Sequence, residues 1–166
     1  MACVFLSLGS NTGDRLAMLS EAVSHLADHY QIDVEAVSKV YETAPVGLVE
    51  QDSFLNIALR IKTSLAPFDL LQATQDIEQK MDRKKTVRWG PRNIDIDIIS
   101  YENVHLETDT LTLPHKEALK RAFVLVPLAE VASVDFKISG KKIKDALKNA
   151  PHDNDIIWLY QETLPF

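Results

Sequence analysis

Two aspartates, Asp95 and Asp97, lie two positions apart in a segment where isoleucines alternate with polar residues. Such alternation is typical of a strand with one buried face, and it would place both carboxylates together on the opposite face. Their Cα atoms would be about 6.6 Å apart, a spacing at which the charges repel, and aspartate is depleted in strands. A hard divalent cation between them would remove the repulsion. A solvated polar face is the alternative interpretation.

The segment before the two aspartates is strongly basic. Residues 80–92, KMDRKKTVRWGPR, contain six Lys or Arg and one Asp, which gives a local charge of +5. The whole chain carries −6, so the other residues together carry −11. A run of charge is usually a solvated surface. Cations beside metal-binding carboxylates, however, are the arrangement that polyphosphate chemistry requires.

Length and composition predict one globular domain over residues 1–166, because 46% of the 166 residues are hydrophobic. The net charge of −6 and the pI of about 5.3 argue against nucleic acid or an anionic membrane as general partners. No apolar stretch approaches the roughly 18 residues of a membrane span, and no basic segment precedes the first apolar run. We therefore expect a cytoplasmic protein whose partners are small molecules. The single cysteine, Cys3, cannot form an internal disulfide.

Periodicity and turn residues predict the elements that must position these groups. We expect strands at 2–8, 31–42, 54–63 and 93–101, helices at 14–29 and 67–81, a turn at 9–13 and a loop at 43–51. This order predicts an α/β (α+β) fold, a ferredoxin-like βαββαβ sandwich with a mostly antiparallel sheet. About 65 further residues would add helices near 117–130 and 141–149 and a strand at 156–160.

Common catalytic and phosphate-binding signatures are missing from the sequence. It contains neither GxxxxGK[ST] nor GxGxxG, which argues against a P-loop and a Rossmann nucleotide site. It lacks GxSxG, and its five histidines show no spacing typical of metal ligands. Two other functions stay open. A ferredoxin-like module could bind RNA through its basic loop, and a metal-dependent phosphodiesterase would also need two carboxylates.

Several blocks of the chain resemble the 6-hydroxymethyl-7,8-dihydropterin pyrophosphokinase family. The most specific is RWGPRNIDIDI at 88–98, and the others are LSLGSN at 6–11, YETAPVG at 41–47, residues 51–56, PH at 114–115 and RAFVL at 121–125. The resemblance implies an ATP-dependent diphosphotransferase of folate biosynthesis. Such enzymes transfer the diphosphate of ATP to the hydroxymethyl group of 6-hydroxymethyl-7,8-dihydropterin, which gives AMP and the pterin diphosphate.

The resemblance also implies roles for individual residues. Two Mg²⁺ ions would bind Asp95 and Asp97, and the catalytic residues would be these two with Arg83 and Arg92. The pterin would contact Thr43, Pro45, Val46, Phe54, Asn56, Trp89 and Phe123. The co-substrate ATP would contact Leu71, Gln75, Glu78, Lys85, Arg88, Trp89, Arg92, Ile98, Leu111, Thr112, His115 and Arg121.

Three positions depart from the commonest family pattern. Lys85 stands where arginine is usual, Asp82 where a small residue often occurs, and Lys116 where proline or an aromatic residue is frequent. Lysine keeps the positive charge but lacks the two-pronged donor geometry of arginine, so the basic segment would orient phosphate less firmly.

The substitution Asp97→Asn tests the role of the carboxylate pair. It keeps the size of the side chain but removes an anionic ligand, so AMP formation should fall by orders of magnitude. The free energy of unfolding without metal should stay equal or rise, because a like-charge repulsion is removed. Activity above about a tenth of wild type, a change in barrier of about 1.4 kcal/mol or less, would contradict a two-metal role.

Overall fold

The computed structural model describes residues 1–43, 53–82, 94–149 and 157–166, without the side chains of Ile157 and Trp158. The first part of the chain forms β1 (Ala2–Ser10), α1 (Arg15–Asp28), β2 (Ile32–Val37), β3 (Val40–Thr43), β4 (Phe54–Thr63), α2 (Pro67–Asp82) and β5 (Asp95–Tyr101). The second part forms β6 (Leu106–Glu107), β7 (Thr112–Leu113), the 3₁₀ helix η1 (Ala118–Lys120), α3 (Ala122–Val131), β8 (Lys137–Ile138), β9 (Lys141–Lys142), α4 (Ile143–Asn149) and β10 (Ile157–Gln161).

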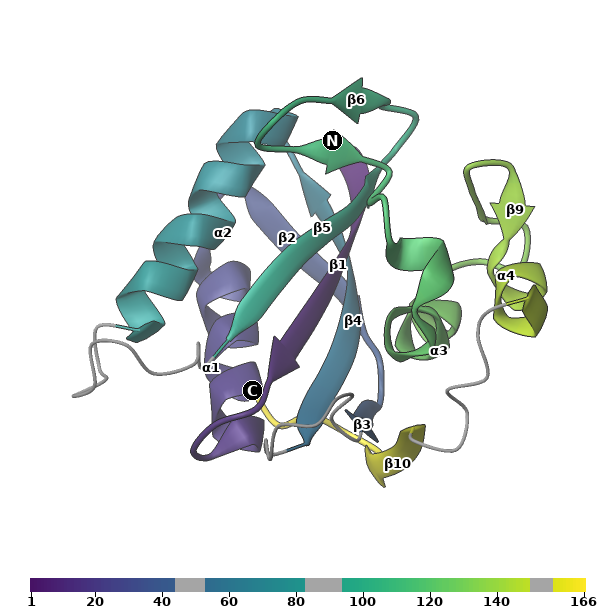
Figure 1. Ribbon diagram of the computed structural model, residues 1–166. Coiled ribbons are helices and arrows are strands. Elements are labelled where there is room, and N and C mark those ends of the chain that lie inside the picture. The colour runs from purple at the N-terminus through teal and green to yellow at the C-terminus, as the bar shows by residue number, and fades with distance from the viewer. Residues whose placement is uncertain (44–52, 83–93, 150–156) are drawn as a thin grey trace.

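One antiparallel sheet connects most of the strands (Figure 1). Its order is β10-β3-β4-β1-β5, and β2 pairs with β4 beside β3. Strand β1 therefore lies between β4 and β5, which is the order of a βαββαβ ferredoxin-like sandwich. The predicted fold class is confirmed. None of the helices in the described ranges is both long and apolar enough to cross a membrane.

Helices α1 and α2 cover the first face of the sheet. Asp14 caps α1, because its Oδ1 accepts the N–H of Ala17 at 3.1 Å. The buried side chains of both helices recur every three or four residues, as an amphipathic helix requires. They pack with the buried side chains of β1, β4 and β5 into the main core. This core includes Leu6, Leu8, Leu19, Leu26, Ile57, Leu59, Leu70, Ile77, Ile96 and Ile98.

Helix α3 lies against the second face, and α4 packs on α3 further from the sheet (Figure 1). Their apolar side chains bury Phe5, Ala58 and Ile99, one residue from each of the three central strands. On β1 the next residue of this face is Ser7, and Gly9 follows it. The appended C-terminal residues therefore supply the second layer of helices.

The predicted strand 31–42 is divided into β2 and β3. Ser38 interrupts it, because its N–H donates to the carbonyl oxygen of Ala58 at 2.9 Å and its Oγ accepts the N–H of Ala58 at 2.8 Å. Val37 pairs with Leu59 while Tyr41 pairs with Asn56, so this strand has one more residue than β4 over the same length. This extra residue is a β-bulge, a second register shift lies between Val34 and Ala36, and both halves continue to pair with β4.

Three other predicted boundaries were wrong in part. The helix at 117–130 is η1 followed by α3, because Arg121 between them is extended with φ −121° and ψ 109°. The helix at 141–149 begins only at Ile143, because β9 pairs with β8 just before it. The turn at 9–13 begins later, since β1 continues through Ser10. The predicted final strand is present as β10 and pairs with β3.

Glu130, near the end of α3, joins this helix to the bulge between β2 and β3. Its carboxylate accepts the N–H of Lys39 at 2.8 Å and the hydroxyl of Tyr41 at 2.6 Å. Burial, together with the hydrogen bond to Glu130, raises the pKa of Tyr41 above its ordinary value of 10.0. The hydroxyl of Tyr41 therefore stays protonated in the folded chain at pH values where it ionises in the unfolded chain.

This shift predicts how Tyr41→Phe changes the pH dependence of stability. The raised pKa contributes stability that is complete below about pH 10 and is lost as the pH rises further, because only the unfolded chain then releases the proton. The free energy of unfolding should differ between wild type and Tyr41→Phe at about pH 8, and the difference should shrink by about pH 11. Urea unfolding at both pH values measures it. The exposed Tyr30 provides the control Tyr30→Phe, and an equal difference at both pH values would contradict the prediction.

Candidate active site

The two aspartates lie on the second face of the sheet. Ile96 between them is buried, whereas Asp95 is half-buried and Asp97 is exposed. Their partners on β1 are small, since Asp95 pairs with Gly9 and Asp97 pairs with Ser7. The sheet therefore leaves room above the carboxylates.

The carboxylate oxygens of Asp95 and Asp97 are suited to bind a hard cation that a substrate also binds. Two carboxylates from alternate positions of one strand supply oxygen ligands on the same side. Within the described ranges, the protein contains no group of three or more His, Cys, Asp or Glu that could hold a metal ion. A cation at Asp95 and Asp97 would therefore take its other ligands from water or phosphate, as Mg²⁺ does in many nucleotide sites.

An amide lies further along the same row of the sheet, and a hydroxyl lies beside it. Gly9 pairs with Asn56 on β4 as well as with Asp95. Asn56 is only 3% exposed, and its Nδ2 donates to Oγ1 of Thr43 at 2.7 Å. A Cβ atom at Gly9 would lie 3.1 Å from Oδ1 of Asn56 and 3.8 Å from Cδ1 of Phe54. The absence of a side chain at Gly9 therefore gives the amide and the ring their space.

Gly9 belongs to this candidate site, although the sequence alone assigned it no role. The motif LSLGSN contains it, but the motif does not show which side chain it faces. Only the register of β1 with β4 and β5 places it between Asn56 and Asp95.

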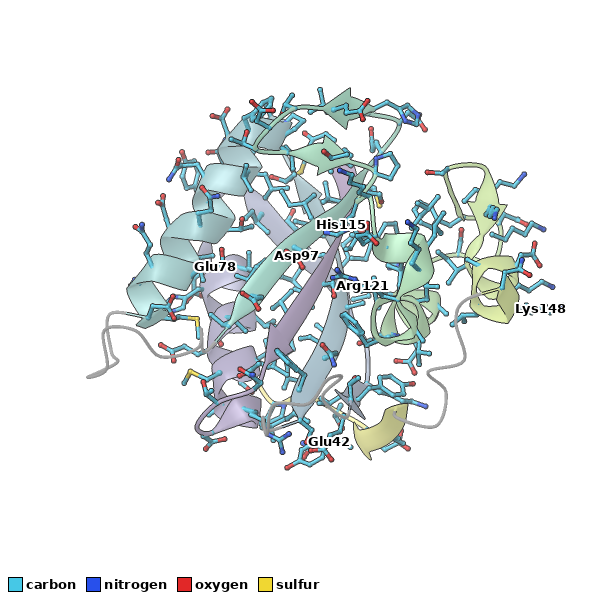
Figure 2. The ribbon with its side chains drawn as sticks, viewed as in Figure 1. Glu42, Glu78, Asp97, His115, Arg121 and Lys148 are labelled. Atoms are coloured by element: carbon cyan, nitrogen blue, oxygen red, sulfur yellow. The ribbon has the colours of Figure 1, made fainter. Side chains whose placement is uncertain are left out.

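A cation and an aromatic ring stand at the beginning of α3. Cζ of Arg121 lies 5.7 Å from the ring centroid of Phe123, which is within the range of a cation–π contact. Phe123 is half-buried against the second core, whereas Arg121 is exposed. In Figure 2, Asp97 on β5, His115 and Arg121 follow one another across the molecule toward α3.

A cleft of about 290 Å³ opens beside Asp97. It brings together five of the residues expected to contact ATP, although they come from α2, β5 and the segment around β7. Its lining consists of Leu71, Ile96, Asp97, Ile98, residues 108–112 and residues 115–117. Leu71, Ile98 and Leu111 give it apolar walls, and Thr112 and His115 add polar groups.

His115 is fixed in this cleft by two hydrogen bonds. It follows the cis peptide Leu113–Pro114, and its own N–H donates to the carbonyl oxygen of Ile99 at 2.7 Å. Nδ1 of its ring accepts the N–H of Glu117 at 3.2 Å. A neutral ring therefore carries its proton on Nε2, so Nε2 can donate to an anion.

Glu78 and Gln75 on α2 occupy different environments. Glu78 is 8% exposed, and its Oε2 accepts the N–H of Ile96 at 3.2 Å. β5 is an edge strand of the sheet, so this bond satisfies a backbone donor that faces away from β1. Gln75 is exposed and does not line the cleft. The expected contacts of both residues with the nucleotide stay predictions.

Several expected site residues lie outside the described residues. Their assigned roles stay predictions from the sequence. They are Pro45, Val46, Arg83, Lys85, Arg88, Trp89 and Arg92.

The contact of Glu78 with β5 predicts the effect of its removal. Glu78→Ala leaves the N–H of Ile96 buried without this acceptor, which should reduce the free energy of unfolding by about 1–3 kcal/mol. Glu78→Gln keeps a carbonyl oxygen and should lose less. The control Asp76→Ala removes an exposed bond to Gln72 on the same helix and should stay within about 0.5 kcal/mol of wild type. Urea unfolding measures the free energy of unfolding of all three variants. If Glu78→Ala loses no more of it than Asp76→Ala does, the hydrogen bond from Ile96 to Glu78 does not stabilise β5.

Comparisons with known proteins agree with this arrangement. A family model described as 7,8-dihydro-6-hydroxymethylpterin-pyrophosphokinase (HPPK) matches residues 5–133. The 2-amino-4-hydroxy-6-hydroxymethyldihydropteridine pyrophosphokinase of Bacillus subtilis is 49% identical over 127 residues, which cover 76% of each chain. The protein of the same name from Methylorubrum extorquens is 48% identical over 147 residues, which cover 89% of this chain and 92% of the relative.

Some similar proteins are much longer. The bifunctional protein FolKE of Lactococcus lactis subsp. lactis is 46% identical over 82% of this chain, but the match spans only 39% of the relative. The crystal structure of Plasmodium falciparum HPPK-DHPS with STZ-DHP aligns with a TM-score of 0.69 at 16% identity, over 89% of this chain and 43% of that chain. At that identity the structure shows a shared fold alone. A family match that covers residues 5–133, and so nearly the whole βαββαβ sandwich, together with relatives near half identical, places this chain in the 7,8-dihydro-6-hydroxymethylpterin-pyrophosphokinase family.

Proposed function

We propose that this chain transfers the diphosphate of ATP to the hydroxymethyl group of 6-hydroxymethyl-7,8-dihydropterin, giving AMP and the pterin diphosphate, as a single cytoplasmic domain of folate biosynthesis. One observation carries the proposal. The carboxylate pair connects two chemically different regions, because Asp97 lines the cleft while Asp95 shares a row with Gly9 and Asn56. A phosphate donor on one side and a flat polar acceptor on the other would meet at these carboxylates. The names of the relatives support the pterin as acceptor and the transfer of a diphosphate group.

The cleft suits the nucleotide. Its apolar walls can contact the adenine ring, and Thr112 can bind polar groups beside it. At the end near Asp97, His115 can donate Nε2–H to a phosphate oxygen, and Arg121 adds a positive charge. Further cations would come from the basic segment, which contains Arg83, Lys85, Arg88 and Arg92. These cations would stabilise charge on the transferred group.

The surface formed by Gly9, Asn56, Thr43 and Phe54 suits the pterin. Phe54 and Phe123 would stack on the two faces of the bicyclic ring, which accounts for the binding of a flat molecule but not for its identity. Identity would come from its polar edge, where Oδ1 of Asn56 can accept an N–H. The bond from Asn56 to Thr43 fixes the orientation of this amide. Pro45, Val46 and Trp89 would complete this end.

The reaction follows from the meeting of these two ends at the carboxylates. The hydroxymethyl oxygen forms a bond to the β-phosphorus of ATP, the bond from that phosphorus to the α,β-bridging oxygen breaks, and AMP leaves while the hydroxyl proton is released. Two Mg²⁺ ions bound by Asp95 and Asp97 would neutralise phosphate oxygens and lower the proton affinity of the hydroxyl. The side chains of the two ends hold the reacting atoms in line, and the cations balance the negative charge.

A product assay tests the proposed function. The chain is incubated with ATP, Mg²⁺ and 6-hydroxymethyl-7,8-dihydropterin, and the nucleotide products are separated. AMP and pterin diphosphate should form in equal amounts, whereas ADP would indicate a different transfer. Hydrolysis of a phosphodiester without pterin would favour the phosphodiesterase alternative. Tight binding of an RNA oligomer in titration calorimetry, with no AMP formed, would favour the RNA-binding module.

Phe123→Ala tests the pterin end alone. Loss of one stacked ring should weaken pterin binding by about 1–3 kcal/mol and leave the affinity for a non-hydrolysable ATP analogue nearly unchanged. Calorimetric titration with each ligand measures this. The control is Phe136→Ala, because Phe136 packs on Phe5 in the same core, with ring centroids 4.5 Å apart. Equal losses for both ligands would instead indicate disruption of the core.

A further inference from the structure

Arg15, the first residue of α1, binds two residues that are distant from it in sequence. Its Nη1 lies 2.7 Å from Oε2 of Glu42, 2.7 Å from the carbonyl oxygen of Ser53 and 3.3 Å from Oγ of Ser53. Ser53 in turn donates its hydroxyl to Oε2 of Glu42 at 3.0 Å. One guanidinium nitrogen therefore joins the end of β3 to the beginning of β4.

This contact is largely shielded from water. The side chains of Arg15 and Glu42 are 21% and 15% exposed. The guanidinium carbon of Arg15 also lies 5.6 Å from the ring centroid of Tyr160 on β10. A partly buried, charge-assisted pair with shared hydrogen bonds is more strongly fixed than an exposed ion pair. We call Arg15, Glu42, Ser53 and Tyr160 the arginine clamp; Glu42 lies near β3 and β10 in Figure 2.

The arginine clamp lies next to residues of the proposed pterin end. Glu42 directly precedes Thr43, and Ser53 directly precedes Phe54. Thr43 and Phe54 are paired across β3 and β4, and Thr43 accepts the hydrogen bond of Asn56. The distance between the two strand ends therefore determines where the amide, the hydroxyl and the ring stand relative to one another.

Strand β10 belongs to the same arrangement, although the family match ends at residue 133. It pairs with β3, so that Ile157 lies opposite Thr43 and Trp158 opposite Glu42. Tyr160 then contacts Arg15. β3 has only four residues and is held between β4 and β10.

We propose that the arginine clamp is a positioning device for the pterin and that β10 acts in recognition of this substrate through Tyr160. The inference rests on the proposed function, because it assumes that Thr43, Phe54 and Asn56 contact the pterin. The cleft proposed for ATP is lined by α2, β5 and the segment around β7, none of which belongs to the clamp. Loss of the clamp should therefore weaken pterin binding and spare ATP binding.

The experiment compares KM for each substrate, together with calorimetric binding of the pterin, in variants of the full chain. Arg15→Ala removes all the clamp contacts, and Tyr160→Leu removes only the aromatic face. Arg15→Lys keeps a cation and a donor nitrogen. Val23→Ala is the control, because Val23 is a fully buried residue of the same helix and is not in the clamp. It loses core contacts without changing the strand ends.

Arg15→Ala should raise KM for the pterin roughly tenfold, which corresponds to about 1.4 kcal/mol, and leave KM for ATP within about twofold. Arg15→Lys should restore part of the loss, and Tyr160→Leu should give a smaller change of the same kind. Val23→Ala should lower the unfolding midpoint while both KM values stay unchanged. If Arg15→Ala folds poorly, Arg15→Lys and Tyr160→Leu carry the test.

Two results would overturn the clamp. One is an equal rise in the KM values for ATP and for the pterin. The other is an unchanged KM for the pterin in Arg15→Ala. If Arg15→Ala does not fold, an unchanged KM for the pterin in both Arg15→Lys and Tyr160→Leu has the same meaning. Failure of the proposed function would look different. In that case the wild-type chain forms no AMP, or Phe123→Ala binds the pterin as well as wild type does. An active wild type with normal pterin binding in the clamp variants would reject only the clamp.

Discussion

Burial of one face of β5 determines where the carboxylates of Asp95 and Asp97 lie. Ile96 and Ile98 pack beneath α1 and α2, so the residues that alternate with them must face the other side. A slip of one residue would move Asp95 and Asp97 into the apolar core, which makes the register strongly specified. Glu78 adds a second restraint, since it binds the N–H of Ile96 on the open side of this edge strand. The repulsion between Asp95 and Asp97 therefore persists, because β5 cannot change its register to separate them from this face.

Partial cover of the second face leaves the space in which chemistry can occur. α3 buries Phe5, Ala58 and Ile99, and the next positions of β1 on this face are Ser7 and Gly9. Small residues at these two positions keep the sheet open between β4 and β5. Larger apolar residues at these positions would fill the proposed site, and a longer helix would be needed to bury them. The same face is thus a core at one end and the proposed binding surface at the other.

The sequence predicted the fold wherever apolar periodicity was complete, as in β1, β4, β5, α1 and α2. It failed where a backbone hydrogen bond decides the local structure. The bulge at Ser38 is not visible in the alternation, because Ala36 and Val40 continue the pattern across it. The extended Arg121 and the hairpin of β8 and β9 likewise depend on pairing and dihedral angles. Such features follow from tertiary contacts that a single sequence does not reveal.

The two ends of the proposed site also differed in how far the sequence alone could predict them. The carboxylate pair belongs to one seven-residue strand, so spacing within that strand was enough to find it. The proposed acceptor side involves Gly9, Arg15, Glu42 and Ser53, whose proximity arises only from strand pairing and from a side chain that reaches across from α1. A four-residue strand such as β3 makes few ladder bonds and needs neighbours to hold it. The proposed recognition of the acceptor therefore depends on contacts between distant segments, including one beyond the family match, whereas the proposed phosphate chemistry would depend on the single strand β5.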